Sequence, residues 1–182
     1  VFVVGDQGVI LHYNGTAWSS MNSGTGTSLT GIWGTSSTNV YASGWGIVLR
    51  YNGTSWSSMM TFGCEIKEIW GTSSTNLWAS GGGTDIRHFD GTTWLTMPTG
   101  SAGDWPEYTW GSGSNNVLVV GSRGTITRYN GTSWSVQATG DPYYLGDIWG
   151  SGANDIFAVG SQGTIRHYNG VAWSSMTSGT AA

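Results

Sequence analysis

Two pairs of carboxylic acids are the residues of this sequence that could most directly do chemistry. Glu65 precedes Glu68 by three positions, and Asp104 precedes Glu107 by the same interval. A glycosidase holds two carboxyl groups at a fixed separation on either side of the bond that it cleaves. Nothing in this spacing establishes that separation, and isolated acids in loops are usually solvated. We therefore expect no catalytic residue and a protein that is not an enzyme.

Basic side chains recur at one position of the sequence pattern, directly before an aromatic residue. They are His12, Arg50, His88, Arg128 and His167. Imidazoles can bind metal ions, but the ligands of one ion must converge on it, and equivalent positions of separate repeats diverge. We expect no metal and no cofactor. Each basic side chain is instead expected to form a hydrogen bond between repeats or a cation–π contact with a neighbouring tryptophan.

These residues belong to a repeat that runs along the whole chain. The sequence Ile-Trp-Gly-Thr-Ser-Ser-Thr-Asn occurs at 32–39 and at 69–76, and looser copies begin at Thr109-Trp110-Gly111 and Ile148-Trp149-Gly150. The Trp-Gly tryptophans stand at 33, 70, 110 and 149, so the period is 37 to 40 residues. A period of that size indicates a repeat architecture.

Each repeat contains four short strand candidates, which in the second copy are 29–34, 40–43, 47–51 and 55–59. They are rich in aromatic and β-branched residues and are bounded by Gly, Asn, Ser or Thr. Asn-Gly joins the third and fourth strands in four copies, and Asp90-Gly91 joins them in the remaining copy. We predict two-residue type I′ turns there, in which both residues have positive φ. No stretch shows a capped helical period, so the protein is predicted to be all-β.

A single four-stranded meander cannot bury both of its faces, but five meanders in a closed ring can. We therefore predict one domain over residues 1–182, a five-bladed β-propeller with the Trp-Gly strand of each blade nearest the axis. The repeat units are about 1–28, 29–65, 66–105, 106–144 and 145–182. The fourth-strand tryptophans are expected to fill the gaps between blades rather than to stack on sugars; they are Trp18, Trp56, Trp94, Trp134 and Trp173.

The first blade is predicted to lack its inner strand, because the chain starts directly with the second strand, Val1-Phe2-Val3-Val4. We infer a segment of a longer protein. An unpaired inner edge is a liability that proteins usually cover. A second copy of the chain, a neighbouring segment of the parent or the chain's own tail could cover it. The tail at 177–182 fits least, because it lacks the Leu-x-x-Ile-Trp pattern. Self-association through this blade is therefore one expected outcome.

The motifs resemble those of known propeller repeats. The pattern Leu-x-x-Ile-Trp-Gly, then Val-Tyr-Ala-Ser-Gly, then Tyr-Asn-Gly-Thr-x-Trp resembles Trp-rich bacterial β-propeller repeats, and is similar in period and layout to tectonin-type lectin repeats. The turn at 51–56 also resembles the Asp-box hairpin of sialidase-like propellers, although Asn replaces the Asp in four copies and one residue is missing before the Trp. The resemblance implies an architecture and identifies no binding residue.

The composition excludes several classes of partner. Charged residues make up 9% of the chain, against roughly 25% in an average soluble domain. A net charge of −4 with only six Lys and Arg residues argues against nucleic acid as a partner. Apolar runs are too short for a membrane span, so no membrane insertion is expected. Cys64 is the sole cysteine, and we expect a small buried hydrophobic residue there, not half of a disulfide.

The connections that differ between copies carry the side chains that break the repeat. In a four-stranded blade, the connection to the next blade and the turn between the second and third strands emerge on one face. We call it the variable face, because the turns on the opposite face barely change. Loops on a rigid scaffold commonly carry function, so the ligand is predicted to bind here. The candidate residues are Trp45, Phe62, Asp104, Trp105, Glu107, Tyr108, Tyr143 and Tyr144, with Asp141 and Asp147 as acidic neighbours.

Three functions fit this pattern. The favoured one is a non-catalytic binding module of a secreted or cell-surface protein, with a protein or glycan ligand on the variable face. A multivalent lectin is the second, but it would need the same exposed side chains in every blade. A structural scaffold without a ligand is the third, and in it the aromatic residues would only plug the mouth of the axial channel.

Overall fold

The computed structural model of the protein describes residues 1–101, 103–137 and 142–180. In these residues the chain forms four antiparallel sheets. The first sheet holds β1 (Phe2–Val4), β2 (Ile10–Tyr13) and β3 (Trp18–Met21). The second holds six strands: β4 (Leu29–Ser36), β5 (Asn39–Tyr51), β6 (Trp56–Ser73), β7 (Asn76–Gly81), β8 (Asp85–Phe89) and β9 (Trp94–Pro98).

The third and fourth sheets have four strands each. The third holds β10 (Pro106–Gly113), β11 (Asn116–Gly121), β12 (Ile126–Tyr129) and β13 (Trp134–Gln137). The fourth holds β14 (Leu145–Gly152), β15 (Asp155–Gly160), β16 (Ile165–Tyr168) and β17 (Trp173–Met176). Three single turns of 3₁₀ helix, η1 (Asp6–Gly8), η2 (Ser122–Gly124) and η3 (Ser161–Gly163), separate second and third strands. The predicted all-β meander is confirmed.

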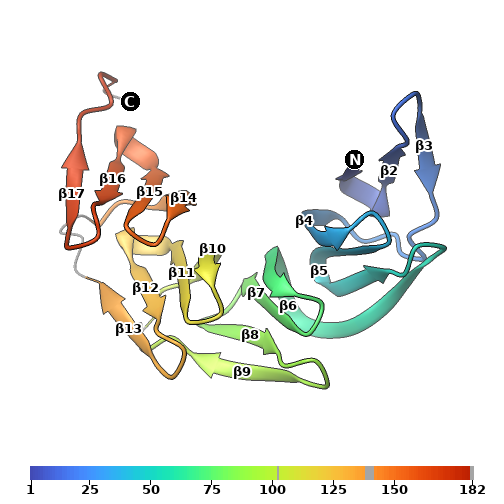
Figure 1. Ribbon diagram of the computed structural model, residues 1–182, viewed down its shortest axis with the longest axis horizontal. Helices are drawn as coiled ribbons and strands as arrows, with labels where there is room; N and C mark the ends of the chain where they lie inside the picture. The colour runs from blue at the N-terminus through green and yellow to red at the C-terminus, as the bar shows by residue number, and fades with distance from the viewer. Residues whose placement is uncertain (102, 138–141, 181–182) are drawn as a thin grey trace.

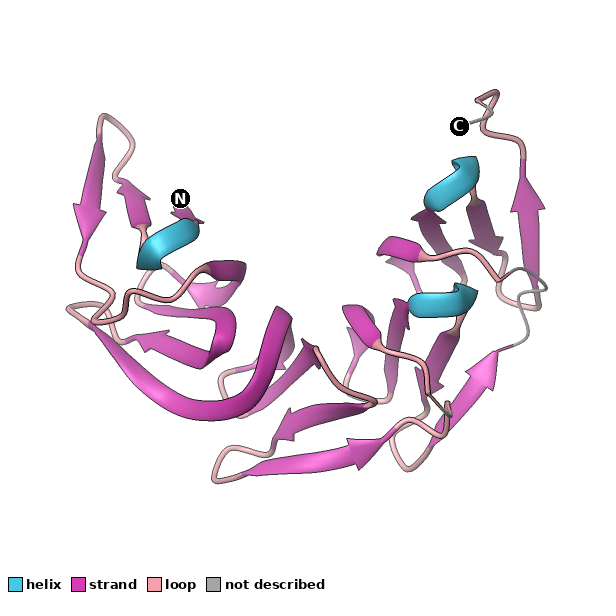
Figure 2. Ribbon diagram, turned by 180° about the vertical axis from the view of Figure 1, so that it is seen from behind, coloured by secondary structure: helices cyan, strands magenta, loops and turns pink. Residues whose placement is uncertain are grey.

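The sheets follow one another along an open arc (Figure 1). The Trp-Gly strands β4, β10 and β14 lie on its inner side, and β3, β9, β13 and β17 lie on its outer side. The first and last sheets form the two tips of the arc, which stand apart in both views (Figure 2). The described residues thus have the radial order predicted for propeller blades, but they do not form the closed ring that we expected of five units.

Two strands are much longer than the sequence predicts. β5 has 13 residues and β6 has 18, and together they join the second and third repeats into one sheet. The first, fourth and fifth copies place a 3₁₀ turn after the second strand, with a residue such as Gln7 at φ 56°. The second copy reads Gly44-Trp45-Gly46 and is one residue shorter there. The chain reverses direction within β5 at this shorter turn, where Gly46 has a φ of 72°, and Arg50 Nε returns to within 3.2 Å of Asn39 Oδ1. Trp45, in the turn, pairs with Glu65 of β6.

The hairpin between third and fourth strands forms in every copy, but its geometry differs from our prediction. In the first copy Tyr13 pairs with Trp18, so the loop has four residues. Gly15 has a φ of 103°, while Asn14 is not among the positive-φ residues of the described chain. The Asn14 Oδ1 atom accepts the N–H groups of Thr16 and Ala17, each at 2.9 Å. The type I′ prediction is wrong, because the Asn side chain itself closes the turn.

Hydrophobic clusters between successive repeats hold the arc together. One of them joins Ile10 of the first sheet to Leu29, Leu49 and Trp56 of the second. Farther along, Trp134 packs edge-on against the buried Trp78 of the preceding sheet, with ring centroids 5.6 Å apart. Trp94 and Trp173 belong to the two remaining clusters, as packing between blades predicts. Cys64 is half-buried at the edge of the cluster that contains Trp94.

The Trp-Gly motif makes a second contact between repeats. A Cβ atom added at Gly71 would lie 3.1 Å from the Cη2 atom of Trp33. A Cβ atom added at Gly111 would lie 2.5 Å from the Cη2 atom of Trp70, and one added at Gly150 would lie 2.8 Å from that of Trp110. Each indole ring thus lies against the glycine of the next Trp-Gly strand. Only glycine leaves room for the ring. The Trp of one repeat therefore packs against the Gly of the next repeat, and the two residues of one motif contact different neighbours.

Four of the five recurring basic residues form side-chain hydrogen bonds within their own sheets, not between repeats as predicted. The Nε atom of Arg128 donates to Asn116 Oδ1 at 2.6 Å, and that of Arg50 donates to Asn39 Oδ1 at 3.2 Å. His88 and His167 contact Asn76 and Asp155 at 2.6 and 2.8 Å. These bonds form because the second and third strands of a sheet pair, and their register brings each basic residue near the Asn or Asp that begins the second strand. Arg128 also lies over Tyr168 of the next sheet, 5.2 Å from the ring centroid.

Candidate ligand-binding face

The variable face is built from two kinds of connection that are hydrogen-bonded to each other. The Ser122 N–H group donates to Trp105 O at 3.2 Å, and the Ser161 N–H group donates to Tyr144 O at 2.9 Å. In the second repeat, the Trp45 N–H group donates to Ser28 O at 3.2 Å. Trp105 and Tyr144 therefore occupy equivalent positions, directly before the inner strands β10 and β14.

A β-bulge follows this position in each inner strand. The ladder register shifts between Leu29 and Gly31, and at the corresponding places of the other three Trp-Gly strands. A bulge leaves one residue unpaired and can re-aim its side chain. The unpaired residues are Thr30, Lys67, Glu107 and Gly146. The bulge thus places a different residue at the same position of each inner strand, with a side chain in three of the four strands.

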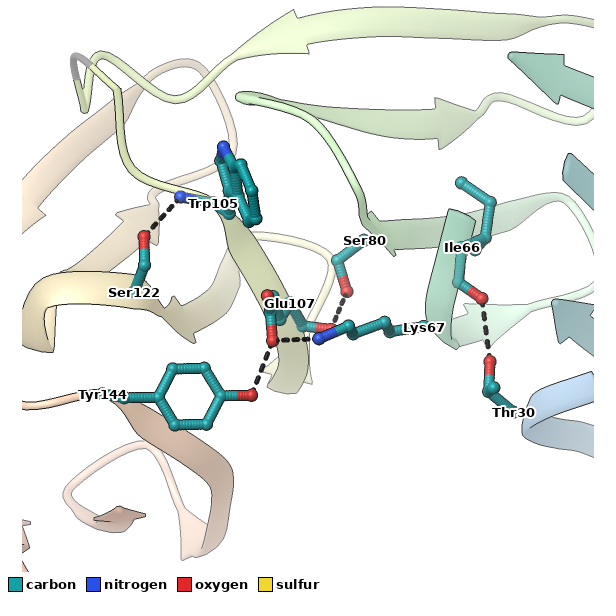
Figure 3. A network of polar contacts seen from close by, with 8 residues as sticks. All are labelled: Thr30, Ile66, Lys67, Ser80, Trp105, Glu107, Ser122 and Tyr144. Carbon is teal, nitrogen blue, oxygen red and sulfur yellow. Dashed lines mark hydrogen bonds and ion pairs between the residues drawn. The ribbon is translucent and has the colours of Figure 1, made fainter. Parts of the chain in front are cut away.

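Two of these bulge residues meet in a polar network (Figure 3). The Lys67 Nζ atom lies 2.6 Å from Glu107 Oε2, and the Tyr144 hydroxyl donates to the same oxygen at 2.6 Å. Ser80 Oγ donates to the backbone oxygen of Glu107 at 2.8 Å. Glu107 is 4% exposed, so its charge is buried and compensated. The network joins β6, β10 and the residue directly before β14 through a single carboxylate.

The two donors of this network stay protonated at neutral pH. Burial alone would lower the pKa of Lys67, but the hydrogen bond and the charge of Glu107 outweigh it and raise the pKa. Burial raises the pKa of the Tyr144 hydroxyl, and its bond to Glu107 raises it further. Both side chains are therefore fixed donors, and they hold the Glu107 carboxylate in one orientation.

Glu68 is a second carboxylate on the inner strands, and it titrates near neutral pH. Burial raises its pKa to about 7, the Thr109 N–H group that donates to it acts in the opposite direction, and the charge of Asp147 adds to the rise. Thr109 also donates its hydroxyl to Ser80 Oγ at 2.9 Å. Glu68 thus bonds to the backbone of the next repeat, so it contributes to the junction as well as to the charge of the face.

The predicted site residues separate into exposed and internal groups. Trp45, Trp105, Tyr143 and Tyr144 are exposed, by 62%, 55%, 44% and 37%. Such exposure of large aromatic side chains on one face is unusual for residues that serve only to pack.

The other four predicted residues are held inside the fold. Phe62 is half-buried and packs edge-on against Trp94, with centroids 5.6 Å apart. Tyr108 packs against the cluster between the third and fourth sheets. Asp104 accepts the Thr125 hydroxyl at 2.5 Å and lies 3.7 Å from Arg123 Nε. Glu107 is the buried centre of the network. Asp147 is exposed, and Asp141 lies outside the described residues.

The sequence places Lys67 in a connection of the variable face, but Lys67, Glu68, Ser80 and Thr109 were not among the predicted site residues. Lys67-Glu68 did carry a signal, because the equivalent positions of the second repeat are Thr30-Gly31. Ser80 and Thr109 carried none, since a hydroxyl residue inside a strand is common in this Ser- and Thr-rich chain.

The face around Trp105 is shallow. The cavity beneath it, lined by Asp104, Trp105, Val120 and Thr127, has a volume of about 10 Å³, whereas small-molecule pockets usually enclose roughly 300–1,000 Å³. Among the residues that the structure describes, no group of three or more His, Cys, Asp or Glu side chains could hold a metal ion. No helix in that part of the chain is long and apolar enough to cross a membrane.

No protein-family model and no curated protein sequence matches the chain. Solved structures do match it. One is described as YCF48 bound to D1 peptide, with a TM-score of 0.74 and 15% identity over 96% of this chain and 62% of that one. The WD40 beta propeller domain of Doa1 has the same TM-score and coverage at 9% identity. Virginiamycin B lyase from Staphylococcus aureus has a TM-score of 0.76 at 11% identity, over 97% of this chain and 68% of its own.

These likenesses show the fold, and no activity follows from identities so low. The chain is built from β-propeller repeats, as the sequence predicts. It spans about 62% of the length of the first solved structures that it matches.

Proposed function

We propose that this chain is a non-catalytic interaction module that binds a peptide segment of a protein ligand on the variable face. The observation that carries the proposal is the pair of exposed aromatic residues, Trp105 and Tyr144, at equivalent positions on either side of the buried Glu107. Aromatic side chains with one polar edge are typical anchors of protein interfaces.

The order of the face supports the same function. Tyr144 is held by its hydrogen bond to Glu107, and the Trp105 backbone N–H group donates to Ser122 Oγ at 2.7 Å. A surface that is ordered before binding loses less conformational entropy when a ligand arrives. The cavity of about 10 Å³ has no room for a small molecule, which favours a ligand that lies across the surface.

Charge and fold suggest the chemistry of the ligand. Asp147 is exposed and lies in β14 directly after the bulge residue, three positions after Tyr144, so we expect basic or hydrogen-bond-donating groups in the peptide. The matched structure described as YCF48 bound to D1 peptide supports a peptide ligand by analogy of fold alone. The exposed aromatic residues differ from repeat to repeat, which disfavours a lectin with one equal site per blade.

The same proposal includes the blade count and the location of the protein. The chain supplies five blades of a propeller, the first without its inner strand, and the three-stranded first sheet supports this reading. Its repeats belong with Trp-rich bacterial and tectonin-type repeats. The low share of charged residues, 9%, and the many hydroxyl and amide side chains motivate a secreted or cell-surface location.

Selection from a random peptide library on the immobilised protein tests the function. Binders are then measured by calorimetry against the wild type and Trp105→Ala, and we expect the variant to bind about tenfold more weakly or worse. Trp18→Ala is the matched control, because Trp18 is 50% exposed but lies on the outer strand β3. A glycan array is probed in parallel.

Two results would contradict the proposal. One is equal peptide affinity of Trp105→Ala and the wild type, accompanied by a large loss of thermal stability in the variant, which would assign Trp105 to packing. The other is binding to glycans alone, with loss in Trp105→Ala, which would make the face a lectin site.

A further inference from the structure

A polar cavity lies between the third and fourth repeats, on the face opposite to the variable face. It has a volume of about 280 Å³, close to the lower limit of roughly 300 Å³ for small-molecule pockets. Turns between first and second strands and hairpins between third and fourth strands form its rim, which includes Asn115 and Asp90. Its lining also includes Trp78, His88 and Tyr129.

Comparison with the next junction shows which group this cavity lacks. Arg128 and His88 are equivalent, since each stands directly before the aromatic residue that ends its third strand. Arg128 Nε donates to Asn116 Oδ1 at 2.6 Å. His88 Nε2 lies at the same distance, 2.6 Å, from Asn76 Oδ1. The imidazole ring ends at this bond, whereas Arg128 continues to its Cζ atom, 5.2 Å from the ring centroid of Tyr168 in the next sheet. The cavity therefore lacks, at this position, the guanidinium group that the next junction contains.

Tyr129 is the aromatic ring that corresponds to Tyr168. Each of them begins a Tyr-Asn-Gly hairpin in the repeat that follows the basic residue. Tyr129 is half-buried, lines the cavity and packs against Trp78 with ring centroids 5.0 Å apart. A guanidinium within about 6 Å of such a ring is attracted to its face. The cavity wall thus offers the same kind of surface that Arg128 uses.

Asp90 gives the rim of the cavity a negative charge. The other four copies of this hairpin have Asn at the same position. The N–H groups of Thr93 and Thr92 and the Thr92 hydroxyl all donate to one oxygen, Oδ1, at 2.7 to 2.8 Å. These bonds lower the pKa of Asp90 to about 2, so the carboxylate is ionised at neutral pH. Oδ2 takes part in none of them, so it can accept a hydrogen bond from a ligand.

No basic group opposes this charge at neutral pH. Burial lowers the pKa of His88, and the charge of Asp90 acts in the opposite direction without outweighing it. None of the described residues that line the cavity is Lys or Arg. The cavity therefore combines an ionised carboxylate, a neutral imidazole and an aromatic wall, which together favour a cation with a flat, polarisable surface.

We propose that this cavity binds the guanidinium group of an arginine side chain from a protein partner. The guanidinium lies between the Asp90 carboxylate and the Tyr129 ring, in the place that the end of Arg128 occupies at the next junction. Arginine fits this site better than lysine, because its planar group stacks on an aromatic ring and donates to a carboxylate at the same time. The site lies on the opposite face from Trp105 and Tyr144, so it does not rest on the proposed function.

Titration with N-acetyl-arginine amide, followed by NMR, tests the proposal on the wild-type protein. We expect saturable shifts at the amides of His88, Asp90 and Tyr129. The citrulline analogue has nearly the same shape but no charge, and we expect it to bind about fivefold more weakly or worse. Free arginine is titrated in parallel and should bind no more tightly, since its own α-carboxylate gains nothing from Asp90.

Two variants copy residues from other repeats, so the fold should tolerate them. Asp90→Asn restores the residue of the other four hairpins and should weaken binding about twofold or more, because the charge is lost. His88→Arg supplies a guanidinium from the chain itself and should abolish binding. Asp85→Asn is the matched control, since it removes the same charge from the other end of β8 and should bind like the wild type. Trp105→Ala should also bind like the wild type, which separates this cavity from the variable face.

Several results would overturn the proposal. They are no saturable binding, equal affinity for the citrulline analogue, unchanged binding by Asp90→Asn or by a folded His88→Arg, and shifts at another junction in place of this one. Much tighter binding of free arginine than of the blocked form would identify the amino acid, and not a protein side chain, as the ligand.

Discussion

The tryptophans between neighbouring repeats differ from the same tryptophans at the tips of the arc. Trp56 is 8% exposed in the cluster between the first and second repeats, whereas its equivalent Trp18 is 50% exposed. At the other tip, Trp149 is 60% exposed, although its equivalents Trp33 and Trp70 lie half-buried against glycines of the next repeat. One sequence position therefore has two environments, set by whether a neighbouring repeat is present.

The difference shows where the stability of a repeat protein resides. A repeat contacts only its neighbours, so its stability is the sum of its own contacts and those at its junctions. The hydrophobic clusters of this chain are junction contacts, formed by side chains from two repeats. A residue that fills a junction should thus be costly to remove, while the same residue at a tip should not.

The largest expected effect comes from the fourth-strand tryptophans. Trp56→Ala removes a buried indole ring that contacts Tyr51 and Phe2, and we expect a loss of about 3–5 kcal/mol in the free energy of unfolding. Trp18→Ala should cost less than about 1 kcal/mol, because half of its surface is already exposed. Urea denaturation followed by fluorescence measures both. Equal losses would show that the junction does not decide the contribution of the residue.

Glycines of the Trp-Gly motif give the next effect. In Gly111→Ala the new methyl group would lie 2.5 Å from Trp70 and 2.8 Å from Asn116 O. In Gly34→Ala the three atoms nearest to it would belong to Asn39 and Val40 of its own repeat, at 2.9 and 3.2 Å. We expect Gly111→Ala to be about 1–3 kcal/mol less stable than Gly34→Ala in the same denaturation assay. If Gly34→Ala destabilises as much, crowding within the strand and not the ring of the preceding repeat explains the glycine.

The smallest effect concerns a polar junction contact. Because the pKa of Glu68 rises from 4.5 to about 7 on folding, the folded state holds a proton that the unfolded state releases between these pH values. Stability contributed by neutral Glu68 is present below about pH 4.5 and is lost as pH rises to 7. Glu68→Gln should remove this loss and be about 1–2 kcal/mol more stable than wild type at pH 8, discounting for partial exposure.

The measurement for Glu68→Gln is the difference in unfolding free energy between variant and wild type from pH 4 to pH 8. Taking the difference cancels the titration of His88, whose pKa is lowered by burial and which acts in the opposite direction over part of this range. A difference that stays constant with pH would mean that Glu68 is ionised in the folded protein throughout.

Local signals in the sequence determined the repeat, its strands and its hairpins. Trp-Gly at 33, 70, 110 and 149 sets the period, and Asn-Gly or Asp-Gly marks each tight connection. These features depend on residues close together in sequence, such as Asn14 and the N–H groups of Thr16 and Ala17. The same local pattern therefore recurs in each copy of the repeat. Even here the turn type was missed, because the sequence does not show which group closes the loop.

Tertiary structure decided what happens between repeats. Lys67 and Glu107 lie 40 residues apart and meet because each is the bulge residue of its inner strand, while Tyr144 reaches Glu107 from the position directly before β14. The merging of β5 and β6, the shape of the arc and the exposure of Trp18 and Trp149 likewise depend on how one repeat packs on the next. The sequence specifies each repeat through local hydrogen bonds and periodicity. Contacts between side chains of different repeats depend on how the sheets pack, so they are determined only by the tertiary structure.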